Sequence, residues 1–321
     1  MISEYINTLD PSFVRLMTGI FALLITASSI GYALYWFKSG GKENATIKNL
    51  NERVNAWWVM ILLLVSFYLL GEMATFILFA IISFFALREF ISITPTKFAD
   101  FKALSLSFFI IIPLQYYFLI HHWYGMFAIF IPVYAFLILP AISALSGDVE
   151  HFLERTSKIQ WGVMIAVYCI SHAPALLLLT IPGFEGKSQL LFLYLLIVVQ
   201  ISDVLQYVFG KLFGKHKIAP IVSPSKTVEG FILGGLTATF IGGSLYWITP
   251  FTFWQSVTMS AIIVIMGFLG GLTLSAVKRS IGAKDWGNMI KGHGGMLDRM
   301  DSVCFAAPIF FHITRYFFSI T

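Results

Sequence analysis

The polar residues best able to do chemistry gather in one stretch near the end of the chain. Ser275, Lys278 and Arg279 follow helical spacing, which would place them on one face of a helix. A glycine-rich segment follows, and then Asp298 and Asp301, whose spacing directs both carboxylates to the same side of a helix start. Magnesium takes one or two carboxylates and completes its coordination with water and phosphate oxygens. Because cations, glycines and spaced acids alternate here, the stretch favours a magnesium-dependent polyphosphate site over a simply solvated run of charge.

Two groups of residues earlier in the chain could complete this site. Asp203 shares a helical face with Gln200 and Tyr207 in an otherwise apolar segment. A carboxylate in such a segment normally faces a partner or a wet cavity, although it could also reach the membrane interface. The loop at residues 222–230 combines proline, hydroxyl groups and Lys226 before a helix start, which suits a phosphate site and a capped turn equally well.

The composition predicts that membrane-spanning helices position these residues. The chain has 58% hydrophobic and only 12% charged residues, whereas soluble proteins average about 25% charged residues. A bilayer core needs roughly 17–25 apolar residues per helix, so we predict an all-α integral membrane protein, a polytopic bundle of nine or ten transmembrane helices. The number depends on whether Gly71 and Glu72 separate two helices. The candidate spans are residues 13–37, 56–70, 72–91, 103–120, 123–145, 161–182, 189–209, 229–249, 254–274 and 302–320.

The basic residues indicate the orientation of these spans. If the spans alternate, 18 of the 21 lysines and arginines fall in or beside every second connection, and Lys187 alone falls in the opposite connections. Such asymmetry places the basic connections in the cytoplasm and both termini outside, which favours ten spans over nine. We therefore expect a protein of the bacterial inner-membrane type with its chemistry on the cytoplasmic face. The net charge of +5 reflects this pattern, and nucleic acid is not expected as a partner.

Two stretches resemble the signatures of the phosphatidate cytidylyltransferase (CDP-diacylglycerol synthase) family. Their order and separation also match, so the resemblance covers about residues 160–321. Residues 1–160 are similar only as a series of transmembrane helices, which leaves 161–321 as the catalytic region, with loops 210–228 and 275–301. The stretches read Asp203-x-x-x-Tyr207-x-x-Gly210-Lys211 with Ser223-Pro224-x-Lys226-Thr227-x-Glu229-Gly230, and Ser275-x-x-Lys278-Arg279-x4-Lys284-Asp285 with Gly292-His293-Gly294-Gly295-x-x-Asp298-Arg299-x-Asp301-Ser302.

This resemblance implies an enzyme of phospholipid biosynthesis. It would transfer the cytidylyl group of CTP to phosphatidic acid or a related anionic lipid phosphate among the membrane lipids, giving CDP-diacylglycerol and pyrophosphate. The resemblance also implies a homodimer and a Mg²⁺ cofactor held by Asp203, Asp298 and Asp301. It implies catalytic roles for Lys226, Lys278, Arg279, Lys284 and Asp298, and substrate-binding roles for Ser223, Pro224, Thr227, Ser275, His293, Gly294, Gly295 and Arg299.

The chain departs from the family pattern at several acidic positions. Gly271 stands where the family usually has Asp, Leu274 where it often has Glu, and Ser280 where it usually has Asp. Lys291 replaces the usual Pro before the glycine run. The change at position 271 removes a carboxylate that the family places at its metal centre, and the losses together make the site more positive. The pattern predicts a divergent paralogue.

Two other functions stay open. A catalytically silent relative could bind anionic lipid or nucleotide, and Gly271 is its best support. A transporter or channel would rest only on the number of spans and on intramembrane polar residues such as Glu72, Gln115 and His172. These residues are scattered over separate spans without paired broken helices, so we place the transporter last.

Overall fold

The computed structural model describes residues 10–38, 45–287, 289 and 294–320, and it is built almost entirely of helices. The first half contains α2 (Pro11–Ala33), η1 (Leu34–Lys38), α3 (Ala45–Leu70), α4 (Glu72–Ile93), η2 (Phe98–Asp100), α5 (Phe101–Leu106), η3 (Ser107–Ile111), α6 (Ile112–Ile120), α7 (Tyr124–Ile129), η4 (Phe130–Ala135) and α8 (Phe136–Ala144). The second half contains α9 (Phe152–Val163), η5 (Met164–Cys169), α10 (Ile170–Ala175), η6 (Leu176–Leu178), α11 (Ser188–Phe213), β1 (Lys217–Ala219), β2 (Ser223–Thr227), η7 (Gly230–Gly234), α12 (Gly235–Ser244), η8 (Tyr246–Ile248), α13 (Phe253–Ser280) and α14 (Leu297–Phe318).

Several of these helices follow one another without a break and form longer rods. Within the described residues, seven stretches are long and apolar enough to cross a membrane, namely Pro11–Phe37, Glu72–Ile93, Phe98–Ile120, Tyr124–Ala144, Phe152–Leu178, Ser188–Phe213 and Phe253–Ser280. The remaining candidate spans correspond to α3, to η7 with α12, and to α14. Gly71 separates α3 from α4 with a positive φ of 92°, so the two are distinct helices. The predicted fold class is confirmed, and the described chain forms ten rods.

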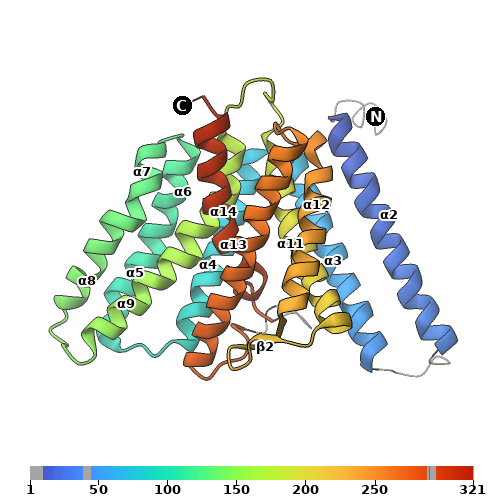
Figure 1. Cartoon of the computed structure of the whole chain (residues 1–321). Coiled ribbons are helices and arrows are strands. Elements are labelled where there is room, and N and C mark those ends of the chain that lie inside the picture. Colours follow the sequence, from blue (N-terminus) through green and yellow to red (C-terminus); the bar gives the residue numbers. More distant parts are fainter. Residues whose placement is uncertain (1–9, 39–44, 288, 290–293, 321) are drawn as a thin grey trace.

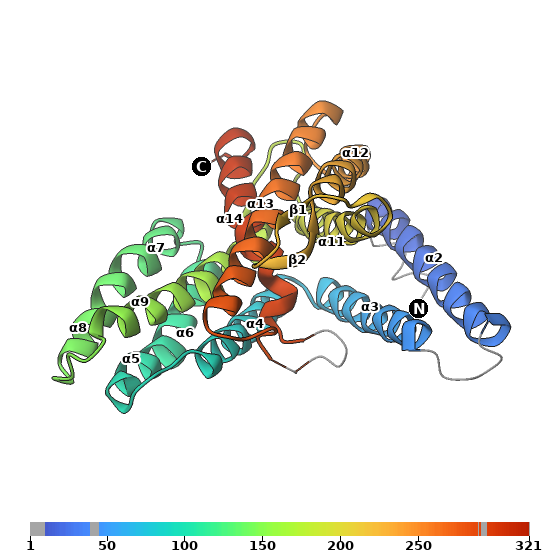
Figure 2. The same cartoon turned by 60° about the horizontal axis from the view of Figure 1, so that its bottom comes forward.

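The rods fan out from a central group of helices (Figure 1). Helices α4 and α11 to α14 lie in the middle, with α2 and α3 on one side and α5 to α9 on the other (Figures 1 and 2). The beginning of α2 and the end of α14 share one end of the bundle. The α4–α5, α8–α9, α11–η7 and α13–α14 connections lie at the opposite end (Figure 1). This second end, called the basic end below, carries most of the lysines and arginines in or beside its connections, in line with the predicted alternation.

Glycines bring the central helices into backbone contact. A β-carbon on Gly234 of η7 would lie 2.6 Å from the Gln206 Cα of α11. A β-carbon on Gly270 of α13 would lie 2.5 Å from the Asp301 carbonyl oxygen of α14. Contacts this short exclude any side chain, and small residues commonly allow such approach between membrane helices. The first contact packs η7, which follows β2, against α11, and the second packs α13 against α14.

The crossing at Gly234 can be tested by adding one methyl group. Gly234→Ala should lower the thermal unfolding midpoint, because overpacking costs about 1–3 kcal/mol and outweighs the gain in helix propensity. Gly19 of α2 has no neighbouring atom within 4 Å of its β-carbon position, so Gly19→Ala is the matched control and should be neutral or stabilising. Thermal unfolding of both variants in detergent would contradict the crossing if the two midpoints moved equally.

Candidate functional site

Two carboxylates from different helices meet at the basic end. Asp203 is on α11 and Asp301 is in the second turn of α14. Ser302 connects them, because its hydroxyl donates to Asp203 Oδ2 at 3.0 Å while its backbone N–H donates to Asp301 Oδ1 at 2.8 Å. Ser302 is buried, whereas Asp203 is exposed. The arrangement gives a pair of oriented acids, of which Asp203 is exposed on the surface of the protein and Asp301 is partly buried.

Lys226 brings a cation to this pair from the loop after α11. It lies on β2, which pairs with β1 in a two-stranded antiparallel sheet. Its Nζ donates to the Phe268 carbonyl oxygen at 3.3 Å and lies 4.6 Å from the centre of the Phe268 ring. Burial lowers the pKa of the Lys226 ammonium, and the charges of Asp203 and Asp301 oppose that shift. Lys226 therefore faces both carboxylates from a partly desolvated position.

The absent acid at position 271 belongs to the same cluster. A β-carbon on Gly271 would lie 2.9 Å from Lys226 Nζ, 3.6 Å from Ser302 Oγ and 3.7 Å from Asp301 Oδ2. A side chain at this position would thus enter the space between the lysine and the acids. In this chain the Lys226 ammonium borders that space, so the position where the family pattern expects a carboxylate is next to a cation.

Asp298 lies in a second cluster that holds the loop between α13 and α14. Its Oδ1 accepts a hydrogen bond from Lys278 Nζ at 2.6 Å, and the two side chains are only 6% and 10% exposed. Its Oδ2 accepts the backbone N–H groups of Trp286 at 2.8 Å and of Gly295 at 2.9 Å. Both oxygens are therefore engaged. Within the described residues no three His, Cys, Asp or Glu side chains form a possible metal cluster, and the contacts of Asp298 are with Lys278 and two backbone N–H groups.

The other predicted site residues are placed in several ways. Thr227 caps the next helix by accepting the Gly230 N–H at 3.1 Å, and Ser275 donates to the Gly271 carbonyl oxygen at 2.6 Å. Arg299 lies within electrostatic range of Asp203 and Asp301. The remaining predicted site residues differ in exposure. Ser223 and Gly295 are buried, Gly294 has a positive φ, and Pro224, Arg279 and Lys284 are exposed. His293 and Lys291 fall outside the described residues.

Sequence reasoning missed two residues that complete the second cluster. Glu89 of α4 accepts the backbone N–H groups of Met296 and Leu297 at the start of α14. Trp286 is fully buried and packs on Phe90 of α4. The available signal was an acid at the end of an apolar run, beside the basic residue Arg88.

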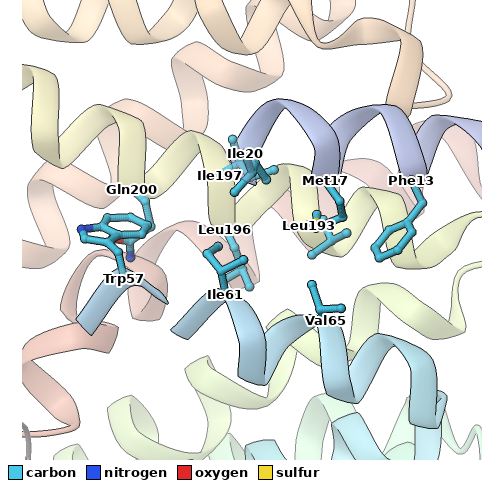
Figure 3. A pocket seen from close by; sticks show the side chains of 10 residues that line it. All are labelled: Phe13, Met17, Ile20, Trp57, Ile61, Val65, Leu193, Leu196, Ile197 and Gln200. Carbon is cyan, nitrogen blue, oxygen red and sulfur yellow. The ribbon is translucent and has the colours of Figure 1, made fainter. Parts of the chain in front are cut away.

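An apolar pocket lies between α2, α3 and α11 (Figure 3). Its cavity volume is about 50 Å³, and it is partly open to the outside. Gln200, its one polar lining residue, lies at one end beside Trp57, and Phe13 lies at the other end (Figure 3). Gln200 precedes Asp203 by one helical turn. The pocket therefore runs along α11 toward the carboxylate pair. Its lining residues are Phe13, Met17, Ile20, Trp57, Ile61, Val65, Leu193, Leu196, Ile197 and Gln200.

These features define an integral membrane protein with a polar cluster of acids and cations at one end of its helical bundle. The family model of the cytidylyltransferase family matches residues 51–317, and the chain belongs to that family. This match reaches far into the N-terminal half, beyond the part in which the signature residues lie. The predicted family is thereby confirmed.

Relatives of known sequence agree with this assignment. The chain is 37% identical over 306 residues to the uncharacterized protein YnbB of Escherichia coli (strain K12), covering 94% of this chain and 97% of that protein. It is 35% identical over 157 residues to the phosphatidate cytidylyltransferase of Staphylococcus aureus (strain COL), covering 48% of this chain and 60% of the relative. A Staphylococcus saprophyticus phosphatidate cytidylyltransferase is 38% identical over 160 residues, with the same coverage.

The ion pair between Lys278 and Asp298 should couple the two residues strongly. Removing one partner of a buried pair costs about 3–5 kcal/mol because it leaves an uncompensated charge. Lys278→Met and Asp298→Asn should therefore each destabilise the protein, and the double variant should lose much less than the sum. The exposed pair of Lys158 and Glu154 on α9 is the control, with an expected coupling of about 0.5 kcal/mol or less. Additive effects at 278 and 298 in chemical unfolding would contradict the pairing.

Proposed function

We propose that this protein transfers the cytidylyl group of CTP to phosphatidic acid or a related anionic lipid phosphate. The observation that carries the proposal is the cluster of Asp203, Asp301 and Lys226 at the end of an apolar pocket. Two polyanions must meet in such a reaction, and positioned cations with oriented acids suit that task. The products would be CDP-diacylglycerol and pyrophosphate.

The reaction needs little proton transfer from the protein. A phosphate oxygen of the lipid attacks the α-phosphorus of CTP, and the bond from that phosphorus to the oxygen bridging to the β-phosphate breaks. The electron pair leaves with pyrophosphate. A phosphate monoester is largely ionised at pH 7, so a general base is unnecessary. The residues of the site would bind, orient and neutralise charge.

The acids of the first cluster fit a magnesium ion that is completed by substrate. Magnesium is usually held by one or two carboxylates together with substrate phosphates, and Asp203 and Asp301 supply two from neighbouring helices. When bound, the ion would neutralise phosphate charge and help orient the reacting groups. Ser302 would keep both carboxylates in place, and Lys226 would donate to a phosphate oxygen. Asp298 would act by holding the end of α13, which carries Arg279, and the loop that carries Lys284 near the phosphates.

The orientation of the protein follows from the same proposal. Its basic end would face the cytoplasm, in agreement with the distribution of lysine and arginine. CTP would then reach the site from water, while the lipid would reach it from the membrane through the pocket beside α11. The lipid phosphate would lie near Lys226, and an acyl chain would extend along the pocket away from Gln200.

The single most direct test is pyrophosphate release by the purified protein. Release should require CTP, phosphatidic acid and magnesium together, stop with a metal chelator, and return on adding magnesium. Asp203→Asn and Asp301→Asn should each reduce the rate about a hundredfold or more, since each removes charge placed for the transition state. Glu154→Gln, on the exposed face of α9, is the control and should keep full activity.

The outcome of this assay also decides between the two functions. Binding of CTP or phosphatidic acid without any release would favour the catalytically silent alternative, which the Lys226 ammonium beside Gly271 supports. If the protein neither released pyrophosphate nor bound CTP or phosphatidic acid, both functions would be contradicted.

The pocket can be tested by filling it. Ile61→Trp should raise the KM for long-chain phosphatidic acid by roughly tenfold, since two displaced methylenes at about 0.8 kcal/mol each suffice for that change. A phosphatidic acid with very short chains should be affected little. Leu62, its neighbour on α3, is 51% exposed and lies outside the pocket lining, so Leu62→Trp is the matched control. Equal KM changes for both lipids, or for both variants, would contradict an acyl chain in this pocket.

A further inference from the structure

The carboxylate of Glu89 joins the N-terminal half of the chain to the start of α14. It is buried, with 8% of the residue exposed, four residues before the end of α4. Its Oε1 accepts the Met296 N–H at 2.8 Å, and its Oε2 accepts the Leu297 N–H at 2.9 Å. More than 200 residues of sequence separate the partners.

Glu89 supplies a helix cap that α14 lacks locally. The first backbone N–H groups of a helix have no partner within it, and a nearby side chain normally accepts them. Met296 is the N-cap residue of α14 and makes no side-chain cap hydrogen bond. A carboxylate at this position also interacts favourably with the positive end of the helix dipole. Glu89 therefore fixes both the beginning and the direction of α14.

The loop before α14 is shaped around this carboxylate. A β-carbon on Gly287 would lie 3.0 Å from Glu89 Oε1, and one on Gly295 would collide with Glu89 Oε2. The adjacent Phe90 stacks on Trp286, with ring centres 5.3 Å apart. Helix α4 thus holds the loop at residues 286–287 and again at residues 295–297.

We propose that Glu89 is a positioning residue for the candidate site, an inference that rests on the proposed function. By fixing the first turn of α14 it sets the place of Asp301 and Ser302, one turn further along the helix. Asp298, which lies in the same turn, holds it in place by accepting hydrogen bonds from Lys278 Nζ and from the Trp286 N–H. Glu89 touches no group of the carboxylate cluster itself, so its effect passes through the backbone.

Glu89→Gln tests this role, because an amide keeps one acceptor but turns an NH₂ group toward the other backbone N–H. Hydrogen exchange of the purified protein should show at least about tenfold lower protection at residues 294–302, with the rest of the chain unchanged. With CTP, magnesium and phosphatidic acid, kcat should fall roughly 10- to 100-fold, because small misplacement of reacting groups is costly. The KM for phosphatidic acid should not change.

Asp100→Asn is the matched control, since it also breaks a buried acid's contact, the ion pair with Arg155 at 3.2 Å, but away from this site. It should lower the unfolding midpoint while leaving kcat and protection at 294–302 unchanged. Unchanged protection in Glu89→Gln, or lost protection with unchanged kcat, would overturn the proposal. If the wild-type protein releases no pyrophosphate, the proposed function is overturned, and the role of Glu89 with it. This outcome can be told apart from failure of the Glu89 proposal alone, because it is seen without any variant.

Discussion

At the basic end of the bundle, the buried ion pair of Lys278 and Asp298 joins the end of α13 to the start of α14. Charges withdrawn from water are costly unless they are paired and their remaining hydrogen-bonding capacity is used. Asp298 meets that condition by also accepting the N–H groups of Trp286 and Gly295. One carboxylate therefore determines how the chain returns into the membrane. The position of Asp301 depends on that return.

Close backbone contacts between helices position the residues around Asp203. Gly234 lies against Gln206, and Gly270 lies against the Asp301 carbonyl group. The first contact holds η7, which follows β2, against α11, and the second holds α14 against α13; Lys226 of β2 lies near Asp203 of α11 and Asp301 of α14. In a membrane the hydrophobic effect does not hold helices together, so such packing and the polar contacts between helices carry the association. Polar contacts such as the one between Ser302 and Asp203 thus serve both helix association and the candidate chemistry.

Position 271, where the chain differs from its family pattern, lies next to Lys226. The Lys226 Nζ lies 2.9 Å from the β-carbon position of Gly271, so the ammonium borders the space of the absent acid. The lysine then has two neighbouring carboxylates, and its charge remains available to a phosphate. The contact of Glu89 with α14 shows in addition that the N-terminal half helps to build this end of the molecule. The family match from residue 51 onward is consistent with that contribution.

The membrane fold, the helical rods and the family could be predicted from the sequence, because they depend on local composition, on apolar run length and on motifs such as Asp298-Arg299-x-Asp301. The order and separation of the two signature stretches also indicated that they belong together. Which acids lie close together depends instead on how the helices pack. Asp203 and Asp301 come together through helix crossings, whereas Asp298 pairs with Lys278 and backbone amides. Glu89 and Trp286 could not be assigned from their neighbours in sequence, because their partners lie on helices distant in the chain. A buried carboxylate takes its role from the groups around it, and spacing along the chain does not specify those groups.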